Sequence, residues 1–255
     1  MLLWIIGHLL AVGIGLSLGL IGGGGAVLAV PILIYVLGLP TSTAIAMSLI
    51  VVSIVSIIGI IPHWKQGNVN WKIAVNFTPP AMLGAFLGGR ISALPWISDT
   101  MQLVSFAIVM LIASYLMISK SKSRLHKIDL STKHYSFPLA IGIALSGFGV
   151  GIITGFVGVG GGFAIIPALV LLGGIPMKKA VGTSLLIIAF NSATGFLGYL
   201  DRVTLDWNLM ISFAGAAISG VLGGAYLARR IPGAKLQTAF GYFLVAIAIL
   251  ILIKR

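Results

Sequence analysis

Ten apolar segments make up most of this chain of 255 residues. Eight of them reach the roughly 20 residues that a helix needs to cross the hydrocarbon core of a bilayer. Only 8% of the residues are charged, whereas soluble domains carry about 25%. The chain therefore cannot cover a water-facing surface with ionic groups, which excludes a soluble enzyme and a disordered protein.

The sequence repeats itself at one offset of 136 residues, without gaps. Gly15 aligns with Gly151 and Pro31 with Pro167, and many further glycine, serine and tryptophan positions keep the same register. We therefore divide the chain into a first membrane repeat, a linker and a second membrane repeat, with boundaries at 1–119, 120–136 and 137–255.

Each repeat is expected to hold five helices. The apolar segments lie near 2–21, 25–37, 42–62, 72–92 and 99–119, and near 137–157, 162–174, 179–199, 206–228 and 236–253. The second segment of each repeat is too short for a straight span and contains a proline, Pro31 or Pro167. A broken helix or half-helix inside the membrane is the predicted structure of both short segments, with the two prolines at the break or gate.

Charge predicts how the two repeats are oriented. An odd number of crossings per repeat turns the second repeat upside down, and the basic linker 120–136 belongs on the cytoplasmic side. Both termini then lie outside. Of the 16 Lys and Arg, four fall outside (Arg90, Arg202, Lys254 and Arg255) and the other 12 inside. The predicted fold is thus an all-α integral membrane protein built from two inverted-topology repeats, an architecture in which transporters place their site near the midplane.

Two glycine runs precede the short segments, at Gly22–Gly25 and at 158–162. Glycine lets backbone N–H groups approach a ligand, and a helix N-terminus carries about half a positive charge. Together these features predict an anion site that needs no basic side chain. The alternative is that the glycines only allow close helix packing. The amides expected to bind are those of Gly23, Gly24, Gly25, Gly160, Gly161 and Gly162.

Polar side chains follow the runs. Ser48 and Ser184 are equivalent in the repeat, and Thr183 and Asn191 lie close by. Ser56 and Ser192, also equivalent, follow eight residues further on. Hydroxyls and the Asn191 amide can donate to oxyanion oxygens. Alternatively, a membrane serine bonds to a carbonyl of its own helix.

The doubled motif resembles the TauE/SafE sulfite exporter family. The motif consists of GLIGGGGAVLAVPILIYVLGLPTSTAIAMSL and GFVGVGGGFAIIPALVLLGGIPMKKAVGTSL. The resemblance implies a permease of the inner membrane that exports sulfite or organosulfonates such as sulfoacetate. The first copy departs from the pattern, because Ala46-Met47-Ser48 stands where the second has Gly182-Thr183-Ser184.

The predicted function is transport of small sulfur oxyanions, with export as its direction, by alternating access around a midplane anion site. An anion channel is the main alternative. A weaker alternative is an intramembrane hydrolase that uses Ser17 of the GLSLG stretch as nucleophile. No Asp or Glu lies within any expected span, so no carboxylate is offered for ion coupling, and the membrane potential is the expected driving force.

The remaining expectations concern partners and cofactors. The expected partners are the small anion and membrane lipid, not nucleic acid, and GxxxG faces permit a homodimer. His63 and His126 are expected in loops, and no His pair has metal-binding spacing, so we predict no metal, cofactor or catalysis.

Overall fold

The computed structural model describes residues 2–92, 96–97, 99–122, 137–157, 162–197 and 203–253. Regular structure in these ranges is helical. The elements are α1 (Leu2–Ile21), η1 (Gly23–Gly25), α2 (Ala26–Tyr35), α3 (Thr41–Lys65), α4 (Trp71–Ser92), α5 (Asp99–Lys122), α6 (Phe137–Val157), α7 (Gly162–Pro167), η2 (Ala168–Leu172), α8 (Met177–Leu197), α9 (Trp207–Arg230) and α10 (Gly233–Ile253). Each expected segment thus contains a helix, which confirms the all-α prediction. Most of the expected linker lies outside the described residues.

Five of the described helices are long and apolar enough to cross a membrane. They run over Leu3–Ile21, Thr43–Lys65, Met177–Leu197, Trp207–Arg230 and Gly233–Ile253, and shorter apolar helices accompany them. The outer surface is apolar as well, because large side chains such as Leu9, Val75, Phe86, Leu145 and Ile211 each expose more than half of their area. Such a surface belongs in lipid. The chain is a multi-pass membrane protein.

The two short segments differ in detail. In the first, η1 is a single 3-10 turn that leads directly into α2, and α2 continues without a break through Pro31. In the second, α7 ends at Pro167 and the chain widens into the π-helical turn η2. Proline has no N–H to donate to the preceding turn, and the following residues bond five apart instead, as in Gly173 N–H to the carbonyl of Ala168 (2.9 Å).

Glycines join each repeat's first helix to the other repeat's fourth helix. A Cβ on Gly15 of α1 would overlap the carbonyl oxygen of Ala217 of α9, and a Cβ on Gly151 of α6 would overlap that of Ala81 of α4. These two contacts are themselves equivalent at the offset of 136. The neighbouring glycines behave in the same way: Gly19, Gly220 and Gly224 between α1 and α9, and Gly84, Gly88 and Gly155 between α4 and α6. All four GxxxG faces are therefore occupied within the chain and are not available for the homodimer that the sequence permitted.

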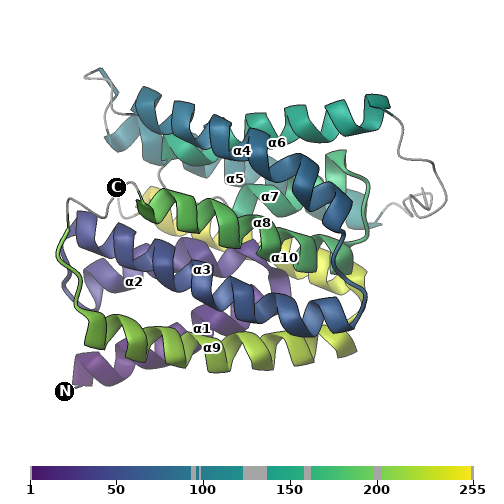
Figure 1. Cartoon of the computed structure of the whole chain (residues 1–255). Helices are drawn as coiled ribbons and strands as arrows, with labels where there is room; N and C mark the ends of the chain where they lie inside the picture. Colours follow the sequence, from purple (N-terminus) through teal and green to yellow (C-terminus); the bar gives the residue numbers. More distant parts are fainter. Residues whose placement is uncertain are drawn as a thin grey trace.

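The centre of the molecule is the pair α3 and α8, which are equivalent in the repeat and run antiparallel. Ser53 donates a hydrogen bond to the carbonyl of Ala189 (2.9 Å), its own counterpart at the offset of 136. On either side of this crossing, Leu185 lies against Gly59, and Leu49 against Gly195. Figure 1 shows α3 and α8 side by side, with α4 and α6 on one side of them and α1 and α9 on the other.

Connections gather at the two ends of the helices. In Figure 1, α1 begins and α10 ends on the left, where α9 also begins. The loop from α3 to α4 lies at the opposite end, where α8 begins. The end of the molecule that carries this loop is called the linker end below, because α5 also ends and α6 also begins there.

Candidate functional site

The glycine runs of the two repeats meet inside the molecule. The backbones of Gly23 and Gly162 are in direct contact, so that a Cβ on either would overlap the other. Gly23, Gly24 and Gly25 are buried, as is Gly162. Gly160 and Gly161 lie outside the described residues. The structure therefore brings the starts of η1 and α7 together, which is the meeting of half-helix N-termini on which an anion site would depend.

The surroundings of η1 combine apolar side chains, one hydroxyl and backbone carbonyl oxygens, because a Cβ on Gly25 would overlap the carbonyl oxygen of Ile14 and one on Gly23 that of Gly162. A Cβ on Gly24 would lie 3.1 Å from Phe243, and one on Gly25 would lie 3.0 Å from Leu18. Gly22 adopts a φ of 76°, which favours glycine, and its missing Cβ would lie 2.6 Å from Oγ of Ser184. The three side chains named here, those of Phe243, Leu18 and Ser184, are all uncharged. A positive potential at this place would have to come from the backbone N–H groups at the starts of the two helices.

Ser184 is the predicted side chain closest to the glycines. Its hydroxyl donates to the carbonyl of Val181 (2.8 Å) and keeps its oxygen lone pairs beside Gly22. Ser48 likewise donates to its own helix, at Ile45 (2.8 Å). Both serines therefore adopt the alternative arrangement considered from the sequence, in which a membrane serine bonds to a carbonyl of its own helix.

Thr183 points elsewhere. Its fully buried hydroxyl accepts a hydrogen bond from the backbone N–H of Asn70, at 2.9 Å. Asn70 lies in the loop between α3 and α4 and also caps α4, through the Ile73 N–H (3.2 Å). In this conformation Thr183 connects that loop to α8 by a hydrogen bond and does not face the glycine runs.

Asn191 lies on the same face of α8 as Ser184, seven residues on. Its amide oxygen is buried and has no hydrogen-bond partner within the described part of the chain. An amide oxygen without a partner costs about 1–3 kcal/mol in a buried place. The unpaired atom is an acceptor, so Asn191 can bind an oxyanion only through the N–H donors of its Nδ2 amide group.

His63 is the residue whose expected position was wrong. It lies in α3 and is only 2% exposed, because the helix continues through Pro62 to Lys65. Its Nε2–H donates to the carbonyl oxygen of Gly19 (3.0 Å), near the end of α1. The imidazole thereby caps the last turn of α1, three residues before the first glycine run. His126 falls outside the described residues.

The nucleophile arrangement around Ser17 does not form. Ser17 lies in the middle of the continuous helix α1, not at the turn from a strand to a helix that a nucleophile elbow requires. His8, nine residues earlier, is engaged with the carbonyl of Trp4 (2.8 Å) and the hydroxyl of Ser212 (2.9 Å).

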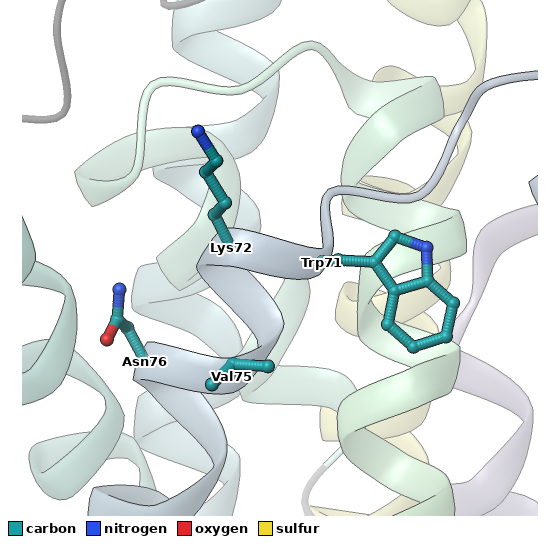
Figure 2. Close-up of a pocket in the computed structure, with 4 residues that line it drawn as sticks. All are labelled: Trp71, Lys72, Val75 and Asn76. Atoms are coloured by element: carbon teal, nitrogen blue, oxygen red, sulfur yellow. The ribbon is translucent and has the colours of Figure 1, made fainter.

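An open surface pocket of about 450 Å³ lies away from the glycine runs, at the start of α4. Trp71, Lys72, Val75 and Asn76 line it, and Figure 2 shows these side chains spreading outward from the first two turns of the helix. Trp71 packs edge to face on Trp64, at 6.2 Å between ring centroids. Paired, half-exposed tryptophans at helix ends are typical of the membrane interface.

Comparison with known proteins gives the family. The model of the family described as "Sulfite exporter TauE/SafE" matches residues 8–251. A "Probable membrane transporter protein" of Xylella fastidiosa strain Temecula1 is 33% identical over 94% of this chain and 91% of its own length. The "Probable membrane transporter protein YdhB" of Bacillus subtilis is 29% identical over 89% and 91%.

A third relative, a "Probable membrane transporter protein" of Haemophilus influenzae, is 28% identical over 94% of both chains. No solved structure matches the chain significantly. The matched family consists of membrane transporters and not of enzymes. On this match across nearly its whole length, the chain belongs to the TauE/SafE sulfite exporter family of membrane transporters.

Proposed function

We propose that this protein exports small sulfur oxyanions, such as sulfite or an organosulfonate, by alternating access around the place where its two glycine runs meet. The observation that carries the proposal is the direct backbone contact between Gly23 and Gly162. Two half-helices that begin there aim their positive ends at one region of low dielectric, where dipoles are least screened. The family name, sulfite exporter, supports the same class of substrate.

We further propose an inverted topology of the two repeats, which the direction of the central helices supports. The helices α3 and α8 are equivalent in the two repeats but run antiparallel. If both span the membrane, the second repeat therefore crosses it in the opposite direction to the first. We place the linker, together with Lys65, Lys72, Lys178 and Arg229, on the cytoplasmic side of the inner membrane, and both termini outside.

The candidate binding groups are backbone amides with help from neutral side chains. Gly23–Gly25 and Gly160–Gly162 supply the amides. Ser184, beside Gly22, and Ser48, its equivalent in the first repeat, take part only when their hydroxyls turn away from the carbonyls of Val181 and Ile45. Asn191 lies about two turns further along α8 and offers its amide N–H donors. Thr183 takes part only in a conformation that releases Asn70. Without a fixed positive side chain, binding is moderate and release is easy, as export needs.

The membrane potential supplies the driving force in this proposal. An inside-negative potential favours the outward movement of a monovalent anion by about 2.3 kcal/mol per 100 mV. Asp99 is the first residue of α5 and the Asp206 side chain caps α9, so neither residue stands in the middle of a described helix to supply a carboxylate for ion coupling.

Flux into or out of proteoliposomes tests the proposal. The purified protein should move sulfite, sulfoacetate or thiosulfate with a rate that saturates, responds to an imposed potential and shows counterflow exchange. Flux without saturation or counterflow would identify a channel, and no flux of any of these anions would refute the proposal.

Asn191→Val places in α8 the residue that α3 has at the equivalent position, Val55. This variant should weaken binding of the transported anion by about 1–3 kcal/mol, because the anion loses one hydrogen-bonding amide. Normal KM at normal membrane abundance would remove Asn191 from the site.

A further inference from the structure

Serine hydroxyls in this protein have a common arrangement. Among the serines that the structure describes, six donate to the carbonyl three residues earlier in their own helix, at 2.7 to 3.0 Å: Ser48, Ser114, Ser146, Ser184, Ser212 and Ser219. Such a carbonyl is within reach of any serine in a helix. A buried serine that makes no such bond therefore stands out.

Two serines of the central helices depart from this arrangement. Ser56 of α3 and Ser192 of α8 are completely buried, and neither hydroxyl has a hydrogen-bond partner among the described residues. They are equivalent in the repeat, at the offset of 136. Ser17 shares the feature, but its counterpart is Ile153, so only the pair in α3 and α8 occurs twice.

The pair is placed evenly about the crossing of α3 and α8. Ser56 follows Ser53 by three residues, and Ser192 follows Ala189 by three residues. Because the two helices run antiparallel, the two hydroxyls lie on opposite sides of the Ser53–Ala189 hydrogen bond. At 1.5 Å per residue, each is about 4.5 Å along the helix from that bond.

Their neighbours in the chain are unequal. Asn191, whose amide oxygen also has no partner, precedes Ser192. Val55 precedes Ser56. The side of the crossing that holds Ser192 is therefore the more polar of the two, and it faces away from the linker end.

We propose that Ser56 and Ser192 are two further substrate-binding residues, whose hydroxyls donate in turn to an oxyanion as it passes the crossing of α3 and α8. This inference rests on the proposed function and adds to it two positions beyond the glycine runs. The ligand class is a small oxyanion, because a neutral O–H donor in an apolar interior favours an acceptor oxygen that carries negative charge. Ser192 contributes more than Ser56, because the Asn191 amide on the same side of the crossing also carries N–H donors, whereas Val55 carries none.

The test measures binding and stability together, on the full-length protein in detergent and in proteoliposomes, with sulfite as the probe. The variants are Ser56→Ala and Ser192→Ala. Ser114→Ala is the matched control, because Ser114 is also buried but donates to the carbonyl of Leu111 (3.0 Å).

In the absence of sulfite, the melting temperature of Ser56→Ala and Ser192→Ala should equal or exceed that of the wild type, because alanine removes a buried hydroxyl that has no partner. The sulfite-dependent rise in melting temperature should shrink, and KM for sulfite should increase about tenfold, more in Ser192→Ala. Ser192→Thr, which keeps the hydroxyl, should restore KM. Ser114→Ala should leave KM unchanged.

Two results separate the inference from the proposed function. If the wild type binds and transports sulfite while both alanine variants keep its KM, the inference is wrong and the proposed function stands. If the wild type neither binds nor transports any sulfur oxyanion, both fall together. A lower melting temperature without sulfite, together with an unchanged KM, would show that the hydroxyls only support the structure.

Discussion

Replacing Gly15 by alanine tests whether the glycines of α1 fix its distance from α9. A Cβ on Gly15 would lie 2.7 Å from the carbonyl carbon of Ala217 and 2.9 Å from the backbone nitrogen of Val221, whereas ordinary contact begins at 3.4 Å. The obstacle is helix backbone, which cannot turn aside as a side chain does. These two contacts alone require a shift of 0.5 to 0.7 Å, and the overlap with the Ala217 carbonyl oxygen requires more. Overpacking of this kind costs about 1–3 kcal/mol.

Gly13, two residues earlier, provides the control. A Cβ there would meet nothing within 4 Å, so Gly13→Ala adds only helix propensity, worth up to about 1 kcal/mol in favour of the folded protein. The repeat offers a second copy of the experiment, because Gly149 is also open and Gly151 is also closed, against the carbonyl of Ala81.

Thermal unfolding of the purified variants in detergent gives the measurement. For a protein of this size, 1 kcal/mol corresponds to about 2–4 °C, so Gly15→Ala and Gly151→Ala should melt about 2–12 °C below the wild type. Gly13→Ala and Gly149→Ala should melt at or above it. If the open and closed positions gave the same melting temperature, the helix contacts described here would be wrong.

Two further predictions concern the linker end and the topology. Thr183→Val leaves the Asn70 N–H without its acceptor and should lower the unfolding free energy by about 1–3 kcal/mol. Met47→Leu at the equivalent position nearly conserves volume and should cost clearly less than Thr183→Val. Equal losses in thermal unfolding would contradict a specific role for the Thr183 hydroxyl. The chain has no cysteine, so Gln66→Cys and Thr204→Cys are clean reporters for impermeant thiol reagents. The first should react from the cytoplasm and the second from outside, and labelling of both from one side would refute the inverted topology.

The helices were predictable because each long apolar segment is bounded by polar or turn-forming residues. The first segment, expected over 2–21, coincides with α1, and the sixth, expected over 137–157, coincides with α6. Helix partners were not predictable in the same way. A GxxxG pattern indicates that another helix backbone approaches closely, but it does not say which helix. The GxxxG faces that could have contacted a second copy of the chain instead pack against helices of the same chain.

The orientation of Thr183 and the position of His63 were not predicted from the sequence. Thr183 and Ser184 are adjacent, so their side chains point about 100° apart on a helix, and only one of them can face Gly22. That signal was available in the sequence. For His63 there was no such signal, because a proline usually marks a helix end, whereas α3 continues past Pro62 and the imidazole finds its acceptor in α1.

The two ends of the central helix pair are closed by different chemistry. At the linker end, Thr183 holds the N–H of Asn70, and Gly182 lies so close to the carbonyl of Asn68 that a Cβ would overlap it. At the opposite end the equivalent residues are Met47 and Ala46, and Ala46 packs in an apolar cluster with Leu49 and Phe196.

This difference bears on the alternating access that we propose. In that mechanism, opening the linker end would break the hydrogen bond from the half-buried Asn70 N–H to Thr183, while opening the other end would expose apolar side chains. Hydrophobic contacts weaken on cooling, whereas the strength of a hydrogen bond does not fall in the same way as the temperature is lowered. The balance between the two open states should therefore shift with temperature, towards the state that is open away from the linker end as the protein is cooled.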